Sequence, residues 1–215
     1  MPNEERLAKG RGGRPTLKRA EQIDARILAA AADLFIERGV DGTSLEAVAA
    51  AAAVSKPTLY ARYPDKSRLF VAVIRANVAA AMPVDADRSG TTQEQRLRQV
   101  GRTVTLKAMQ PVPLGLMRLY IAEAPRHGAL IRDLDRMGRE VALDAIAGAI
   151  ADDTGAIEHA RIVAGRFLDM VFVPHQMRAL LGDLPQEGDP LHPTLDARIE
   201  DAVAVLKALA LLPVD

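Results

Sequence analysis

The chain has 215 residues, of which 49% are hydrophobic, 26% charged and only 3% aromatic, and its formal net charge at pH 7 is zero. The absence of cysteine excludes disulfides, thiolate zinc sites and a cysteine nucleophile. The longest apolar run, Ala47 to Val54, is too short to span a bilayer, and the first residues lack the apolar segment of a signal peptide, so we expect a soluble cytoplasmic protein without membrane contact.

Charge is distributed unevenly along the chain. Residues 1–80 hold 13 Lys and Arg against 9 Asp and Glu, a net of +4, whereas the remaining residues hold 15 against 19, a net of −4. Residues 1–19 alone carry six basic and two acidic side chains. A basic front on an acidic body favours contact between the front and a polyanion.

Helical periodicity dominates from Ala20 onward, and no two-residue alternation typical of strands is present. The first predicted helix ends at Arg38, because Gly39 then stands where a left-handed residue commonly terminates a helix. The apolar stripe of this helix consists of Ile23, Ile27, Ala31, Leu34 and Phe35.

A short second helix is predicted from Ser44 to about Ala52. Thr43 and Glu46 have the spacing of a capping box, in which the Thr43 hydroxyl accepts the Glu46 amide and the Glu46 side chain reaches back.

A third helix is expected to begin at Ser55, the predicted N-cap. Pro57 lies in its first turn, where the missing N–H costs little. Pro64 ends this helix near Arg62, and Asp65 caps a longer fourth helix.

The rest of the chain predicts further helices joined by short connections rich in proline, glycine and aspartate. Residues 82–90 indicate a linker or a sharp junction, and Thr91 with Glu94 forms a possible capping box after it. Helices are expected at about 92–109, 113–125, 128–151, 156–181 and 194–212, which gives an all-α fold of about nine helices.

Two short helices joined by a tight turn, after a longer helix, are typical of a helix-turn-helix. In the third helix, Leu59 and Tyr63 are four residues apart and are expected to face the core. Tyr60 is expected to point outward and to offer its hydroxyl to a phosphate. The expected solvent side comprises Lys56, Thr58, Tyr60 and Arg62.

Residues 23–70 resemble the DNA-binding domain of the TetR family of bacterial transcriptional regulators. Ala53 stands where that family often has glycine in the turn, and we expect it to adopt a conformation with negative φ. Tyr63 stands where phenylalanine is usual, and its core role is unchanged. The matching features are Leu34-Phe35 with Arg38-Gly39, Gly42-Thr43-Ser44 with Val48-Ala49, the stretch VSKPTLY from Val54 to Tyr60, and Tyr63-Pro64-Asp65-Lys66 with Leu69-Phe70.

The resemblance implies binding to double-stranded DNA. Thr43 and Lys66 would hold backbone phosphates, Lys66 through its charge and the helix dipole. Lys56, Pro57 and Thr58 would lie in the major groove and read sequence. The predicted DNA-binding residues are Arg11, Arg14, Thr43, Ser55, Lys56, Pro57, Thr58, Tyr60, Arg62 and Lys66. The alternative, a solvated charged helix end in an ordinary bundle, fits each residue taken alone.

The stretch GRGGRPT, residues 10–16, resembles an AT-hook, in which arginine lies along a narrow minor groove. Arg11 and Arg14 would enter the groove, while glycine permits a close approach of the backbone. The alternative is a solubilising tail.

The body is expected to form a homodimer and to hold an effector. The penultimate helix carries an apolar stripe, and the last helix is apolar over more than one face, which indicates that the last helix has two surfaces to bury. The family resemblance implies a four-helix dimer interface formed by these two helices. A two-fold dimer would place its recognition helices on a palindrome. The predicted interface residues are Val163, Met177, Leu181, Ile199, Val203 and Leu206. A helix central to its own core is the alternative.

A cavity for a small hydrophobic effector is implied by the same resemblance, and residues 116–126 are similar to the carboxy-terminal domain of the AefR-like subgroup. Methionines adapt to irregular ligands, although plain core packing is the alternative for each residue. The predicted effector residues are Val104, Met117, Arg118, Tyr120, Met137, Phe167, Met170 and His175.

Catalytic chemistry is not indicated. The four histidines show no metal-binding spacing, and the sequence lacks a Gly-rich phosphate loop and a GxSxG motif, so no cofactor, metal or catalytic residue is predicted. The prediction is therefore a dimeric transcriptional repressor with a flexible basic arm (1–19), a DNA-binding domain (20–80) and an effector-binding and dimerisation domain (81–215). A DNA-bound regulator or architectural protein without an effector, or a helical-bundle enzyme, are the alternatives.

Overall fold

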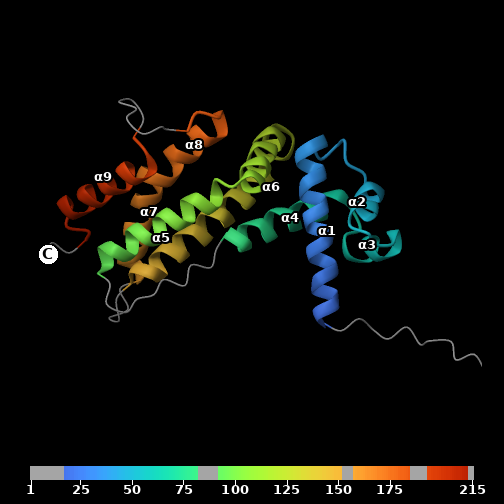
Figure 1. Cartoon of the computed structure of the whole chain (residues 1–215), viewed down its shortest axis with the longest axis horizontal. Helices are drawn as coiled ribbons and strands as arrows, with labels where there is room; N and C mark the ends of the chain where they lie inside the picture. The colour runs from blue at the N-terminus through green and yellow to red at the C-terminus, as the bar shows by residue number, and fades with distance from the viewer. Residues whose placement is uncertain (1–16, 82–91, 152–156, 185–192, 213–215) are drawn as a thin grey trace, which may run out of the picture.

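The computed structural model describes residues 17–81, 92–151, 157–184 and 193–212, and every regular element within these ranges is a helix (Figure 1). The predicted all-α fold of about nine helices is confirmed. Arg11 and Arg14 of the predicted arm lie outside the described residues. The elements are α1 (Leu17–Arg38), α2 (Leu45–Ala51), α3 (Lys56–Arg62), α4 (Lys66–Ala81), α5 (Gln93–Ala108), α6 (Pro111–Ile150), α7 (Ile157–Phe167), the π-helix η1 (Leu168–Phe172), α8 (Val173–Leu181) and α9 (Leu195–Ala208).

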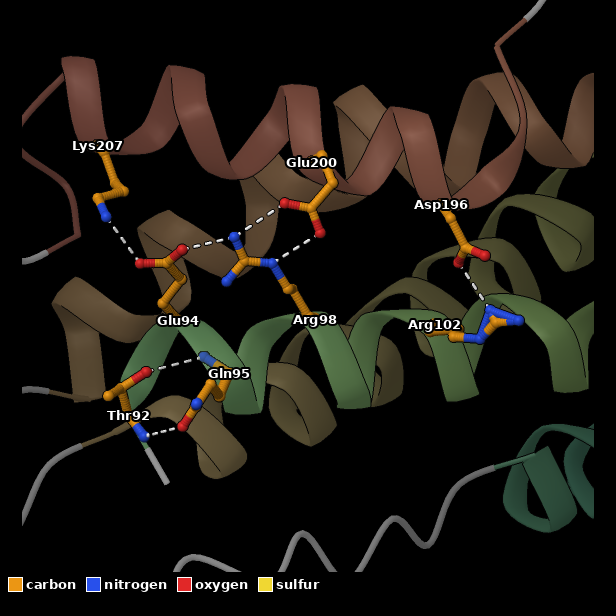
Figure 2. A network of polar contacts seen from close by, with 8 residues as sticks. All are labelled: Thr92, Glu94, Gln95, Arg98, Arg102, Asp196, Glu200 and Lys207. Atoms are coloured by element: carbon orange, nitrogen blue, oxygen red, sulfur yellow. Dashed lines mark hydrogen bonds and ion pairs between the residues drawn. The ribbon is translucent and has the colours of Figure 1, made fainter. Parts of the chain in front are cut away.

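The start of α5 differs by one residue from the predicted capping box. Thr92 accepts a hydrogen bond from the Gln95 amide at 3.1 Å, and the Gln95 side chain accepts one from the Thr92 amide at 2.8 Å (Figure 2). Glutamine serves in this motif as well as glutamate does. The sequence therefore allows two capping boxes one residue apart, Thr91 with Glu94 and Thr92 with Gln95.

Helix α6 bends where a connection was expected. The two predicted helices, 113–125 and 128–151, are continuous except at His127, whose φ of −126° and ψ of 33° are not helical. Pro125 lies just before this point, and proline removes an internal hydrogen bond and crowds the preceding turn. The predicted interruption is therefore present as a kink.

A second irregularity, η1, was not predicted. The Val173 amide donates to the carbonyl of Leu168, five residues back, instead of four. Pro174 follows and has no N–H to offer the Met170 carbonyl, four residues before it. The missing donor accounts for a local π-type register between α7 and α8.

Two apolar clusters form the core. The first joins α5, the second half of α6, α7, η1 and α9, and in it Gly101 lies against the Phe167 ring so closely that a Cβ would be 2.3 Å from two ring atoms. The second joins α1 to α4 and includes the α6 residues Leu116, Ile131 and Leu134. Figure 1 shows α1 to α3 at one end of the molecule and α5, α7, α8 and α9 at the other, with α4 between them.

Helix α6 therefore shares a core with the amino-terminal helices. A Cβ on Gly115 would lie 2.9 Å from Ile36 Cδ1 of α1, and Arg126 Nη1 donates to Asp41 Oδ2 at 3.0 Å. The proposed domain boundary between residues 80 and 81 is thus crossed by continuous packing.

Candidate nucleic-acid interface

The turn between α2 and α3 is built around an alanine in a left-handed conformation. Ala53 has φ of 51°, so the expectation of a negative φ is wrong. The Ala53 amide donates to the Ala50 carbonyl at 3.1 Å and the Val54 amide to the Ala49 carbonyl at 3.0 Å. This pair of bonds is a Schellman motif, which requires its C′ residue to be left-handed and explains the preference for glycine there.

Ser44, not Thr43, caps α2. The Ser44 hydroxyl accepts the Ala47 amide at 3.1 Å. The Thr43 side chain is buried, and its hydroxyl lies 2.8 Å from the Gly39 carbonyl and 3.1 Å from the Leu34 carbonyl. The predicted Thr43 capping bond is therefore wrong. Because the hydroxyl proton is directed into the loop, the contact between Thr43 and a phosphate stays a prediction that this conformation does not favour.

Helix α3 exposes Lys56 and Tyr60 of its expected solvent side, whereas Thr58 and Arg62 are half-buried. The Ser55 hydroxyl accepts the Thr58 amide at 3.2 Å and lies 2.7 Å from the Thr58 hydroxyl. Leu59 is fully buried, whereas Lys56 and Pro57 are exposed. Burial of one leucine holds α3 against the second cluster and leaves its amino-terminal turn on the surface.

Tyr60 is exposed but has a partner. Its hydroxyl donates to Glu46 Oε1 of α2 at 2.8 Å. Backbone hydrogen bonding, followed by this bond, lowers the pKa of Glu46, while the same bond raises the pKa of Tyr60. A carboxylate therefore stands on the outer face beside Lys56, whose charge also lowers the Glu46 pKa.

Asp24 of α1 anchors the end of α3. Arg62 Nη1 donates to Asp24 Oδ2 at 2.9 Å, and the Tyr63 hydroxyl donates to Asp24 Oδ1 at 3.4 Å. Tyr63 packs half-buried against the second cluster, as predicted from its spacing. Arg62 is thus a structural link in this conformation and not a free cation.

Lys66 closes the gap between the α1–α2 loop and α4. Its ammonium group donates to the carbonyls of Val40 at 2.8 Å and Asp41 at 3.0 Å. Lys66 and Tyr60 both line an open hollow of about 370 Å³ beside the start of α2. Through Tyr60, this hollow adjoins helix α3.

A second, more enclosed cavity of about 380 Å³ lies between α4, α6, η1 and α8. Its floor is apolar and includes the nearly inaccessible side chains of Leu116, Leu134 and Leu168. Ile74 and Val78 bring the second half of α4 into the wall.

Residues 27–73 match the family model described as bacterial regulatory proteins of the tetR family. An uncharacterized HTH-type transcriptional regulator of Mycobacterium bovis is 38% identical over 107 residues, which cover 46% of this chain and 54% of that one. The transcriptional activator FasR of Mycolicibacterium smegmatis is 29% identical over 145 residues, covering 65% of this chain and 64% of FasR. The chain spans about half the length of the first of these relatives.

Solved structures match over most of the chain. A protein of Mesorhizobium loti assigned to the TetR family has a TM-score of 0.67 and 26% identity, with 87% of this chain and 98% of that one covered. Residues 27–73 thus carry a TetR-type DNA-binding segment, and the fold of the chain is similar to that of TetR-family proteins. The Flavonoid-responsive Regulator FrrA is similar as well, with a TM-score of 0.66, 26% identity, and coverage of 87% and 97%.

Of the effector residues expected from the TetR resemblance, Met117 and Tyr120 line the enclosed cavity. Arg118 instead donates to the carbonyls of Leu180 and Ala179 at the end of α8, where a cation complements the helix dipole. The other predicted residues do not line this cavity, because Val104 and Phe167 are fully buried in the first cluster, Met170 packs against it, Met137 lies in a separate hollow and His175 is buried in α8.

Sequence reasoning missed the polar residues of the cavity. Asn77, Asp135 and Gln176 line it, together with Gly138 and Arg139. Residues 135, 138 and 139 repeat at helical spacing on α6, a signal that could have indicated one face, but nothing in the pattern shows that α4 lies opposite.

The dimer-interface residues expected of a TetR protein fall into two groups. Met177 and Leu181 of α8 are 53% and 68% exposed, which leaves them available to a partner. Val163, Ile199, Val203 and Leu206 are at most 3% exposed and pack in the first cluster of this chain, so their contact with a partner subunit stays a prediction. Within this chain, their apolar stripes face the other helices of the first cluster.

A network of charged side chains joins α5 to α9 (Figure 2). Arg98 donates to both oxygens of Glu200 at 2.8 and 2.9 Å and pairs with Glu94 at 2.5 Å. Lys207 donates to Glu94 at 2.9 Å. Hydrogen bonding from Lys207, then from Arg98, lowers the pKa of Glu94, and bonding to Glu200 raises that of Arg98.

Within the described ranges, no cluster of three or more His, Cys, Asp or Glu side chains is arranged to hold a metal ion. Among the same residues, no helix combines the length and hydropathy needed to cross a membrane.

Proposed function

We propose that this protein is a DNA-binding transcriptional regulator of the TetR family that represses its target by binding a palindromic operator as a homodimer and leaves it when a small apolar effector binds. The proposal rests on one observation above others: α4 lies in the wall of the enclosed cavity while its first residue, Lys66, belongs to the outward-facing helix-turn-helix surface. Such a protein would act in the cytoplasm and without enzymatic activity.

The outer face of α3 would enter the major groove. Lys56, Pro57 and Thr58 lie on its amino-terminal turn and would meet base edges, with the Thr58 methyl group and Pro57 suited to thymine methyl groups. Ser55 fixes this turn as its N-cap. Tyr60 would contact the backbone after leaving Glu46.

Lys66 and the loop that it binds would receive the neighbouring phosphate. Because Thr43 uses its hydroxyl internally, the exposed hydroxyl of Ser44 is the better candidate in this loop. Arg62 would serve by keeping α3 in place through Asp24. Arg11 and Arg14 stay proposed minor-groove contacts.

Dimer formation would use the exposed apolar surface of α8 and α9. Met177, Leu181, Val205 and Leu209 are between 45% and 68% exposed, although buried leucine and valine are the norm. A two-fold pairing of these helices would set the spacing of two α3 helices along a palindrome.

Effector release requires different affinities in two conformations. A ligand between α4 and α6 would favour a larger separation of these helices, and α4 carries that shift to Lys66 and α3. FasR is described as an activator and FrrA as flavonoid-responsive. The experiments must therefore test two further points: whether the protein represses or activates its target, and whether an aromatic effector releases it from DNA.

The test starts with selection of genomic fragments bound by the purified protein, followed by gel shifts on the recovered sites. Lys56→Ala should weaken binding to the recovered sites and relax the sequence preference at the base pair that Lys56 would contact. Arg166→Ala, an exposed cation on α7, is the matched control and should leave affinity unchanged. Recovery of genomic fragments that share no sequence would contradict the proposed operator binding. An equal loss of DNA affinity in Lys56→Ala and Arg166→Ala would contradict the proposed role of the α3 face. A reporter driven by a recovered site should be expressed less when the protein is present; higher expression would indicate activation.

A further inference from the structure

The two charged side chains that line the enclosed cavity differ in whether they already have a partner of opposite charge. Among its lining residues only Asp135 and Arg139 are charged, both on α6. Arg139 donates to Asp169 at 3.0 Å. Asp135 has no ion pair with a basic side chain in the described part of the molecule. The negative charge at the cavity is thus open to a ligand, whereas the positive charge is already compensated.

Tyr120 places a second hydrogen-bond acceptor beside the Asp135 carboxylate. The Tyr120 hydroxyl lies beside Asp135, and burial, followed by the charge of Asp135 and hydrogen bonding to it, raises the pKa of Tyr120. When Tyr120 donates to Asp135, the tyrosine oxygen keeps its lone pairs and the carboxylate keeps acceptor sites. This edge of the cavity can therefore satisfy an O–H or N–H group of a ligand.

Two uncharged amides complete the polar margin. Asn77 of α4 and Gln176 of α8 line the cavity, and neither side chain has a hydrogen-bond partner within the residues that the structure describes. Each amide both donates and accepts, so neither demands an ionised ligand group. Below them the cavity is apolar, with Ile74, Leu116 and Leu168 at most 4% exposed.

We infer that this cavity takes an uncharged, largely apolar molecule with an O–H or N–H donor, and that Asp135 selects it against carboxylates of similar shape. This inference rests on the proposed function, since it specifies the chemical class of the effector. A carboxylate would meet the unpaired negative charge of Asp135, and a molecule without a donor would leave the acceptors of Asp135 and Tyr120 unsatisfied. The cavity volume of about 380 Å³ lies in the range of small-molecule sites.

Three probes that share one carbon skeleton distinguish the effect of ligand charge from the effect of a hydrogen-bond donor. At pH 7, 2-naphthol is uncharged and carries a donor, 2-methoxynaphthalene is uncharged without a donor, and 2-naphthoate is an anion. Isothermal titration of the full chain should give the tightest binding for 2-naphthol. The preference over 2-naphthoate should be at least about tenfold, which corresponds to about 1.4 kcal/mol.

Two variants and one control variant show whether the probes bind in this cavity and whether Asp135 sets the preference. Gly138→Leu adds a side chain where a Cβ would have only Val78 near it, at 3.9 Å, and should abolish binding of every probe while helix α6 is retained. Asp135→Asn should bring 2-naphthol and 2-naphthoate within about threefold of each other. Asp133→Asn removes the same charge two residues away, outside this cavity, and should preserve the preference.

Equal affinity for 2-naphthol and 2-naphthoate, an unchanged preference in Asp135→Asn, or no binding by any probe would overturn the inference. Binding that persists in folded Gly138→Leu would place the probes elsewhere and overturn it too. A different result bears on the proposed function alone: selective binding in this cavity without any loss of affinity for the recovered operator would leave the ligand class standing and refute effector release.

Discussion

Replacement of Ala53 by glycine is expected to stabilise the protein. Ala53 occupies the C′ position of the Schellman motif after α2 with φ of 51°, and its side chain is exposed. A Cβ in this conformation costs about 1–2 kcal/mol, and glycine loses about 0.5–1 kcal/mol more backbone entropy on folding. The free energy of unfolding should therefore rise by about 0.5–1 kcal/mol, and the Tm by about 1–4 °C. Urea unfolding followed by circular dichroism measures the change.

A matched control lies three residues earlier. Ala50 is exposed in the last turns of α2, so Ala50→Gly should lower the free energy of unfolding by about 0.5–1 kcal/mol. Ala210 provides a repeat, because it has φ of 55° and the same pair of hydrogen bonds after α9. If Ala53→Gly destabilised the protein as much as Ala50→Gly does, the left-handed assignment and the reasoning from it would be refuted.

Three further changes should alter stability. Gly101→Ala should cost about 1–3 kcal/mol by driving a Cβ into Phe167, and Phe167→Leu in the same chain should recover part of the loss in a double-mutant cycle of urea midpoints; additive costs would contradict the contact. Gly42→Ala should cost a similar amount, because a Cβ would lie 2.3 Å from the Arg38 carbonyl, and an unchanged midpoint would show that the loop adapts freely. Glu94→Gln should lower the Tm at pH 7 but not at pH 3, since a carboxylate with a depressed pKa stabilises above its unfolded pKa and ceases to do so as pH falls through the folded one; an equal deficit at both pH values would contradict the network.

Local signals in the sequence predicted most helices. Gly39 and Gly182 end helices as left-handed residues, and Pro125 marks the kink in α6. The two capping errors are of one kind: at α2 and α5 the sequence offers two adjacent hydroxyl residues, and the second of the two is the N-cap. Thr43 is drawn into the loop by the carbonyls of Leu34 and Gly39, which periodicity does not reveal.

The site was predicted unevenly for a related reason. The exposed side of α3 follows from spacing within one helix, so Lys56, Pro57 and Tyr60 could be placed from the sequence alone. An apolar stripe shows that a face is buried but not by what. Val163 and Leu206 therefore looked equally suited to a partner subunit and to their own core. The cavity depends on which helices meet, and α4 opposite α6 is a tertiary fact.

The proposed coupling between the cavity and the α3 surface would depend on packing more than on the Arg126–Asp41 ion pair. Arg126 and Asp41 join the kink of α6 to the α1–α2 loop, but both are more than two-thirds exposed, and such pairs contribute about 0.2–1 kcal/mol. Leu116 and Leu134 are at most 5% exposed, lie in the cluster shared with α1 to α4 and also line the cavity. Burying each such side chain is worth about 1.5–3 kcal/mol. A ligand that displaces these two leucines would therefore disturb the apolar cluster on which α3 packs. Loss of the Arg126–Asp41 ion pair alone would leave this packing unchanged.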